Sequence, residues 1–377
     1  MKRRMPITVF HPLSAAHGEV RGISKAGPHE GGHLGTRFWR IAGAAGYTCL
    51  LLVALALALA PAPPAGAEEV CAPPSGGQQF SDWSAPINLG PIVNSEGTDQ
   101  GPAISKDELE LYFIRQVGVL GGPDLGDIWV TTRKHKNDPW GPPQNLGPTI
   151  NTSFRESLPA LSRDGRRLYF SSAGHEGGFG GFDIWVSERI DRRDPLGWQA
   201  PVNLGSGINT GGQELGPMPF EDPSTQTFTL YFYAIRPGTG ARDLFTSTLD
   251  ENGSFTAAVP ISELNTPFDD EQPSIRRDGL EMFFVSNRPG SVVDPTTGLP
   301  SSDIWVSTRA STSDPWGPPV NLGPVINTAG LEGRPALSFD GRSLYFFSNG
   351  HGGSGLTDLF VSTRTRLDDF DDGDDDD

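Results

Sequence analysis

The sequence predicts an all-β fold, a five-bladed β-propeller of four-stranded antiparallel blades. Three observations lead to this prediction. A block of 57 to 61 residues recurs along the chain. Each block holds four short runs of β-branched or aromatic residues. Gly and Pro, with 48 and 34 occurrences among 377 residues, separate these runs as turn residues do. An apolar content of 36% argues against a disordered chain.

The motif W-x-x-P-x-N-L-G marks the repeat most clearly. Its copies begin at Trp83, Trp140, Trp198, Phe255 and Trp316, and the copy at Phe255 is degenerate. Successive copies start 57, 58, 57 and 61 residues apart. Every Trp outside the leader occupies one of two positions in the repeat. The same packing requirement therefore recurs in each block, as it does in a repeat architecture.

The second copy illustrates the four strands expected in each block. They are residues 158–162, 168–172, 183–188 and 201–204, and Asp164-Gly165 joins the first two strands. An Asp-Gly pair between two such runs is a strong hairpin signal. The fourth and fifth copies have it as well, whereas the first and third copies lack it and are expected to turn differently. Four antiparallel strands repeated radially form a β-propeller.

The order of the strands predicts how the ring closes. The chain opens with a strand of the fourth type, at residues 83–90, and ends with one of the third type, at 358–363. A linear stack would leave both as exposed edges, which invite aggregation. We therefore expect residues 80–94 to pair with the blade formed by residues 333–364 and to close the circle.

The termini differ from the repeat region in composition. Residues 1–67 are expected to be a leader with a signal peptide, because basic residues precede an apolar run and an Ala-Gly-Ala site follows it. A single membrane anchor is the alternative. We further expect a linker at 68–79, the propeller at 80–366 and a disordered acidic tail at 367–377, which holds eight Asp residues.

Charge and cysteine content exclude two classes of protein. With 46 acidic and 29 basic residues, the chain has a formal net charge of −17. Nucleic acid is not an expected partner, because contacts to phosphate need a basic surface. Two cysteines, one of them in the leader, cannot form a disulfide framework.

The repeat resembles the PD40, or WD40-like, β-propeller repeat of TolB-like exported proteins. The resemblance rests on the pattern E-x-x-P-x-x-S-x-D-G-x-x-L-Y-F-x-S, a Gly-rich loop and D-I-W-V-S-x-R, which residues 156–189 match nearly throughout. It implies a propeller of about 290 residues. It also implies a role in binding proteins or other components of the cell envelope.

An Asn followed five residues later by a carboxylate is the sharpest candidate site. The pairs are Asn94/Asp99, Asn151/Glu156, Asn209/Glu214, Asn265/Asp270 and Asn327/Glu332. In a propeller this segment leads into the inner strand, so five carboxylates would ring one mouth of the central channel. They would hold a cation such as calcium or a positively charged partner. Alternatively, each pair only bonds to loop backbone, and its strict periodicity favours this structural role.

Residues that occur in some blades only are the second set of candidates. His175 and His351 lie in Gly-His-x-Gly-Gly loops, and Glu176 adjoins the first of them. They are expected to be loop residues or ligand contacts, and a metal site stays unassigned. No G-x-S-x-G, H-E-x-x-H, phosphate loop or dinucleotide motif is present after the leader.

These observations favour an exported, non-catalytic scaffold. We expect it to be a periplasmic or extracellular monomer, with no cofactor and no assigned catalytic residue. It would bind an envelope protein or glycan through its channel mouth or loop face, and would contact a membrane only through an uncleaved leader. The alternative is an extracellular glycoside hydrolase, or another hydrolase, that uses central carboxylates. That chemistry needs two carboxyl groups in different environments, whereas the repeated acids are nearly identical. A purely structural surface protein is the third hypothesis.

Overall fold

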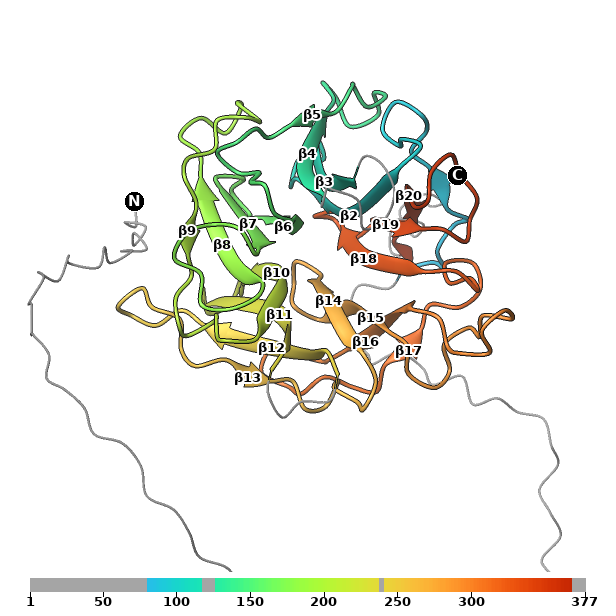
Figure 1. Cartoon of the computed structure of the whole chain (residues 1–377). Coiled ribbons are helices and arrows are strands. Elements are labelled where there is room, and N and C mark those ends of the chain that lie inside the picture. Colours follow the sequence, from blue (N-terminus) through green and yellow to red (C-terminus); the bar gives the residue numbers. More distant parts are fainter. Residues whose placement is uncertain (1–79, 117–125, 237–240, 368–377) are drawn as a thin grey trace, which may run out of the picture. The chain divides into compact units, whose positions relative to one another are not determined.

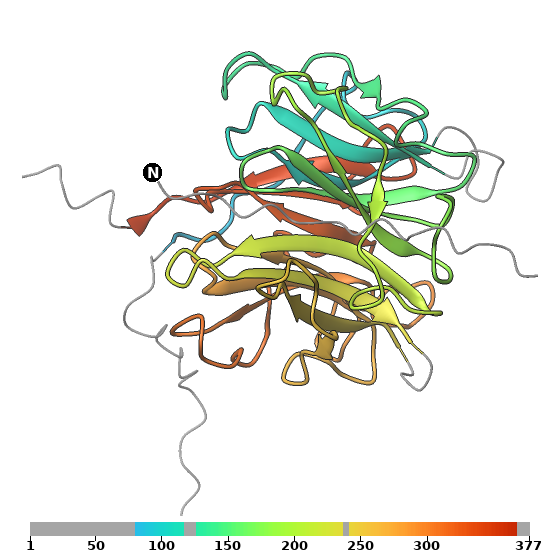
Figure 2. The ribbon, with the colours of Figure 1, turned by 90° about the vertical axis from the view of Figure 1, so that its left-hand side faces the viewer.

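A computed structural model describes residues 80–116, 126–236 and 241–367. These residues form five four-stranded antiparallel sheets around a common centre (Figure 1). The inner strands are β2 (Thr98–Ile104), β6 (Glu156–Leu161), β10 (Gln213–Glu221), β14 (Asp270–Ile275) and β18 (Glu332–Leu337). Figure 2 shows the same blades from the side. The predicted five-bladed propeller is confirmed.

The other three strands of each blade follow outward in sequence order. The second strands are β3 (Glu110–Gln116), β7 (Arg167–Ser172), β11 (Phe228–Ile235), β15 (Glu281–Ser286) and β19 (Ser343–Ser348). The third strands are β4 (Asp127–Thr132), β8 (Asp183–Glu188), β12 (Asp243–Thr248), β16 (Asp303–Thr308) and β20 (Asp358–Thr363). The outer strands are β1 (Ile87–Asn88), β5 (Gln144–Asn145), β9 (Val202–Asn203), β13 (Val259–Pro260) and β17 (Val320–Asn321).

The first strand of the chain completes the last blade. Ile87 of β1 pairs with Val361 of β20, and Asn88 pairs with Phe360, so this sheet has the order β1-β20-β19-β18. A further bridge joins Phe80 to Arg366. The predicted closure of the ring is confirmed, and it gives β20 a partner that it would otherwise lack.

Apolar side chains of the second and third strands form the core between the blades. The residue that opens each Leu-Tyr-Phe motif, or its Met equivalent, is fully buried, and the set is Leu111, Leu168, Leu230, Met282 and Leu344. One cluster joins Tyr112 and Ile128 of the first blade to Phe170 and Trp185 of the second. Each blade thus buries a face against its neighbour, which explains why the same residues recur in every block.

A repeated Arg–Trp contact fastens the inner hairpin of a blade to its outer edge. The guanidinium carbon lies 4.1 to 4.6 Å from the Trp ring centre in four pairs, Arg133/Trp140, Arg189/Trp198, Arg309/Trp316 and Arg364/Trp83. Each arginine Nε also donates a hydrogen bond of 2.7 to 2.8 Å to a carbonyl of the hairpin turn. The degenerate copy has Leu249 and Phe255 instead, so it has lost both partners together.

The two turns without Asp-Gly still reach a left-handed conformation. Gly165 has a φ of 68° in the second copy, and Glu108 has 59° and Gln226 has 61° in the first and third copies. Glu108 is buried, and its carboxylate forms a 2.6 Å ion pair with Lys136. The turn of the first copy therefore differs only in its residues, and that of the third copy is also one residue longer, while the backbone requirement is shared.

The predicted leader, with its signal peptide or anchor, and the acidic tail after Leu367 lie outside the described residues. None of the residues that the structure describes belongs to a helix long and apolar enough to cross a membrane.

Candidate functional site

The five repeated carboxylates lie at the starts of the inner strands, as the sequence predicts. We call this side of the ring the N-side mouth, and the side where the inner strands end the C-side mouth. Asp99, Glu156, Glu214, Asp270 and Glu332 are all fully buried. Each carboxylate accepts bonds from the Ser or Thr that follows its partner Asn, through both backbone N–H and hydroxyl, at 2.6 to 2.9 Å.

The second strand supplies one more partner to each carboxylate. Ser172 Oγ donates to Glu156 at 2.8 Å, and Ser348 Oγ donates to Glu332 at 2.7 Å. In the other three blades the partner is an arginine: Arg115 on Asp99, Arg236 on Glu214 and Arg288 on Asp270. These carboxylates therefore bond to their own blades, and none of them is exposed at the mouth.

The five predicted asparagines also form hydrogen bonds with the backbone. The Asn151 Oδ1 accepts from Ile128 N at 2.9 Å, and its Nδ2 donates to Ile128 O at 3.0 Å. Asn94, Asn209, Asn265 and Asn327 repeat this two-way bond with the third strand of their own blades. Each asparagine thus fixes the connection that leads into the next inner strand.

The loop histidines pack against aromatic side chains of their own blades and contact the connection from the preceding blade. His175 Nε2 lies 3.0 Å from Ile150 O, and His351 Nε2 lies 2.8 Å from Ile326 O. Both rings contact aromatic side chains, Trp185 beside His175 and Phe360 beside His351. Burial lowers the pKa of His175. Glu176 is exposed, and the described residues contain no group of three or more His, Cys, Asp or Glu side chains placed to hold a metal.

The axis of the ring is bridged by Arg334, which the sequence did not single out. From the fifth blade, Arg334 Nη2 donates to Pro159 O of the second blade at 3.0 Å and to Pro217 O of the third at 2.9 Å. Its side chain therefore crosses the centre between the two mouths. Burial lowers the pKa of Arg334 to about 10, and its Nη1 is buried without a hydrogen-bond partner. Arg334 also has a φ of 46°, a strained conformation for a side chain of this kind.

A second pair of carboxylates lies at the start of β14, in two different environments. Arg242 Nη1 is 3.0 Å from Asp269 Oδ2, and Arg242 Nε is 3.5 Å from Glu271 Oε2. The Asp269 side chain is 34% exposed, whereas that of Glu271 is 11% exposed. Because side chains alternate along a strand, both lie on one side and Asp270 lies on the other.

The protonation of this pair follows from its surroundings. Burial raises the pKa of Glu271 to about 7, although the Arg242 cation opposes the rise, and the negative charges of Asp269 and Asp270 add to it. Tyr233 lies in the electrostatic field of Glu271, Arg242 and Arg334, and burial raises the pKa of its hydroxyl. The N-side mouth thus holds one carboxyl group that is largely protonated below neutral pH beside a more exposed carboxylate.

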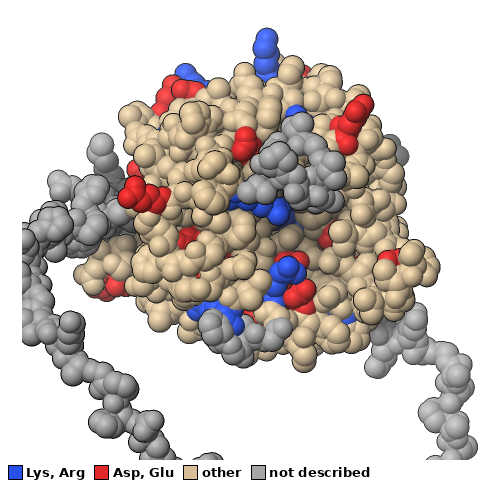
Figure 3. Space-filling view, in the orientation of Figure 1, with Lys and Arg blue, Asp and Glu red and all other residues tan. Residues whose placement is uncertain are grey.

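The sequence contained a signal for this pair that the repeat obscured. The residue after the repeated acid is Gln100, Ser157, Leu215, Glu271 or Gly333, so only the fourth blade carries an acid there. On the face seen in Figure 3, Lys and Arg side chains lie both near the centre of the ring and at its edge, and Asp and Glu side chains lie beside them and farther out. A search for positions that differ between blades would have found Glu271.

Comparisons with known proteins identify the fold. No family model and no curated protein matches the chain. Among solved structures, an α-L-arabinofuranosidase from Lactobacillus brevis matches with a TM-score of 0.52 and 16% identity, over 75% of this chain and 94% of that one. A Bacillus subtilis arabinanase matches with 0.48 and 14%, over 73% and 96%. A putative TolB from Agrobacterium tumefaciens matches with 0.41 and 15%, over 76% and 91%. At 16% identity the likeness to the arabinofuranosidase shows a shared fold alone.

These matches correct the functional expectation drawn from the sequence. A non-catalytic, protein-binding scaffold of the PD40 kind was expected, but several of the similar solved structures are glycoside hydrolases. The repeated acids, which suggested a binding mouth, are fully buried.

Proposed function

We propose that this protein is a glycan hydrolase whose chemistry takes place at the N-side mouth. The observation that carries the proposal is the pair Asp269 and Glu271, two carboxyl groups that share Arg242 but differ in burial. Glycoside hydrolysis commonly uses one protonated carboxylic acid and one carboxylate. Two such groups whose environments separate their pKa values provide this division of roles.

In this proposal Glu271 is the general acid. Its raised pKa of about 7 keeps a proton on the carboxyl group under mildly acidic and near-neutral conditions. That proton passes to the glycosidic oxygen as the bond to the leaving sugar breaks. Asp269, which contacts Arg242 at 3.0 Å, is the second carboxyl group and acts as nucleophile or as the base that activates water.

Two further observations support this assignment. Arg242 contacts both carboxyl groups. Asp269 and Glu271 both lie at the start of β14, so the backbone there sets the distance between the two groups. The fold is shared with the arabinofuranosidase described above, whose name supplies furanosides of arabinose as the first substrates to test. The leader pattern adds the proposal that the enzyme acts outside the cytoplasm, where such glycans are met.

The test is hydrolysis of a panel of aryl glycosides, beginning with 4-nitrophenyl arabinofuranoside, and of branched arabinan. We expect Glu271→Gln to lower kcat/KM by about 10²- to 10⁴-fold on arabinan, as loss of a general acid does. The loss should be smaller on an aryl glycoside with a very acidic leaving group, which needs no proton. Glu251→Gln, an exposed acid on the outer connection of the third blade, is the matched control and should retain activity.

The same experiment separates general acid catalysis from mere loss of structure. A Glu271→Gln protein that unfolds like the wild type but loses activity equally on all leaving groups would contradict the role of Glu271. Absence of hydrolysis by the wild type across the panel would overturn the proposed function itself.

A further inference from the structure

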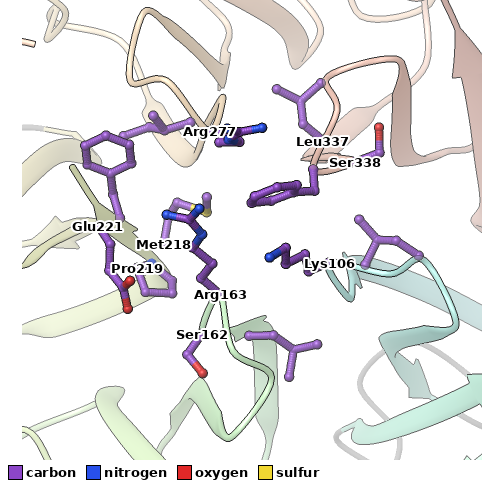
Figure 4. A pocket seen from close by; sticks show the side chains of 14 residues that line it. Lys106, Ser162, Arg163, Met218, Pro219, Glu221, Arg277, Leu337 and Ser338 are labelled. Atoms are coloured by element: carbon purple, nitrogen blue, oxygen red, sulfur yellow. The ribbon is translucent and has the colours of Figure 1, made fainter. Parts of the chain in front are cut away.

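The C-side mouth contains a pocket on the axis, opposite to the carboxyl pair. All five blades line it, because its walls come from the ends of the inner strands and the turns that follow them. Figure 4 shows Lys106, Arg163 and Arg277 directed toward the middle of this pocket from three different blades. The blade colours run in the opposite sense in Figure 4 and Figure 1, so the two views face opposite sides of the ring.

The rim of the pocket breaks the symmetry of the repeat. Its five residues each lie four positions after the proline of their inner strand, and they are Lys106, Arg163, Glu221, Arg277 and Phe339. Equivalent backbone positions thus carry three cations, one acid and one aromatic ring. The packing of a blade does not require this variety, since a structural need would repeat with the blade.

The three cations converge on Phe339. Lys106 Nζ lies 4.6 Å from the centre of the ring, and the guanidinium carbons of Arg163 and Arg277 lie 5.3 and 4.9 Å from it. At these distances each cation is attracted to the ring, which holds the three side chains together against their mutual repulsion.

None of these three cations has an ion pair with another described residue, in contrast to buried arginines such as Arg189 and Arg364. Arg189 is paired with Glu110 at 2.6 Å, and Arg364 with Glu281 at 2.6 Å. Three positive charges without an ion pair, against the single acid Glu221 on the same rim, therefore meet in a chain whose net charge is −17. This arrangement concentrates positive potential in a concave site, which attracts a negatively charged ligand.

We propose that the C-side pocket binds a compact anionic group with at least two negative charges. Two planar guanidinium groups and one ammonium group match the oxygens that a phosphate ester and a small polycarboxylate have in common. Apolar side chains such as Leu161 and Ile275 line the wall of the pocket, so the anion can carry a small apolar body. The site is separate from the proposed hydrolase centre and does not depend on it.

Calorimetric titration of the full-length protein with inorganic phosphate and, separately, with citrate tests the proposal. It also distinguishes a phosphate ligand from a polycarboxylate ligand. We expect binding that weakens as salt is added, since the rim is exposed. Arg163→Gln and Arg277→Gln should each weaken it about tenfold, the typical effect of losing a charge-assisted hydrogen bond. Arg193→Gln, an exposed arginine on the outer connection of the second blade, is the matched control and should bind as the wild type does.

Substitution of Glu221 should change the anion affinity in the opposite direction. Because its carboxylate lies on the same rim, Glu221→Gln should tighten anion binding about two- to fivefold by removing a repulsion. Phe339→Leu keeps an apolar side chain but removes the ring, and should weaken binding by releasing the three cations. Neither substitution removes a positive charge, so these effects separate a built site from general attraction to surface charge.

The influence of the acidic tail on anion binding is tested in the full-length chain. Replacement of its eight aspartates by asparagine should leave anion affinity unchanged or increase it, and an increase would mean that the tail competes for the same site. Absence of phosphate and citrate binding in both the wild type and the tail variant would overturn the proposal. Binding that Arg163→Gln and Arg193→Gln weaken equally would also overturn it.

Discussion

Replacement of Glu271 by Gln should stabilise the protein at alkaline pH and not at acidic pH. The pKa of this carboxyl group is raised from 4.5 to about 7 in the folded state, chiefly by burial. The folded state therefore prefers the protonated form. The contribution of Glu271 to stability is fully present below pH 4.5 and is lost as the pH rises through about 7.

The size of the effect follows from the same shift. At 1.36 kcal/mol for each pH unit, ionisation of Glu271 costs the folded state about 3 kcal/mol at pH 8. Gln has nearly the same shape and no charge. The free energy of unfolding of the variant, measured relative to the wild type, should thus rise by about 3 kcal/mol between pH 4 and pH 8.

Urea denaturation at several pH values measures this difference directly. Groups that titrate in both proteins cancel, and any change in hydrogen bonding by Gln adds an offset that does not vary with pH. Glu251→Gln, at an exposed site, should give a difference near zero throughout. A Glu271→Gln difference that stays constant from pH 4 to pH 8 would refute the inference that Glu271 is buried with a raised pKa.

Three further predictions concern the same region and the closure of the ring. Arg242→Gln removes the cation that holds down the pKa of Glu271, so the alkaline limb of the activity profile should move to higher pH, and an unmoved limb would exclude that coupling. Asn94→Ala removes hydrogen bonds that tie the closing segment to Leu359 and should lower the free energy of unfolding by about 2–3 kcal/mol, against at most about 0.5 kcal/mol for exposed Asn252→Ala. Glu332→Gln weakens three hydrogen bonds and should cost about 1–3 kcal/mol in urea melts while hydrolysis persists. Loss of activity in the folded Glu332→Gln variant would assign this acid to the chemistry.

The parts of the fold that repeat could be predicted from the sequence, in one strand to the residue, although the inner strand expected at residues 158–162 lies at Glu156–Leu161. The third strand of the second blade was expected at residues 183–188 and lies at Asp183–Glu188. It could be placed because its pattern of alternating residues and its flanking loops occur in all five copies. The outer strand expected at residues 201–204 is limited to Val202–Asn203. Its edge faces outward, and the Asn203 side chain turns back to donate to Asp183 Oδ2 at 3.1 Å, which ends the pairing early.

The candidate site was harder to predict, because its residues meet only across the ring. Arg334 bonds to carbonyls of two blades that lie 117 and 175 residues away along the chain. No spacing rule connects such positions before the number of blades and their order around the axis are known. Glu271 and Arg242 come from neighbouring blades at positions whose backbones meet in every copy, but only this copy carries charged side chains at both of them.

The distinction between repeating and non-repeating positions also has an energetic basis. A repeated acid such as Glu156 is buried with a full set of donors, so five copies of it build five equivalent loops. Arg334 instead keeps a buried Nη1 without a hydrogen-bond partner, and the buried Glu271 carboxyl meets Arg242 Nε at 3.5 Å, farther than any donor of Glu156. Buried polar groups without a full set of partners lower stability. We therefore infer that residues which break the repeat near the axis are the first to test for function in this propeller, ahead of those that define it.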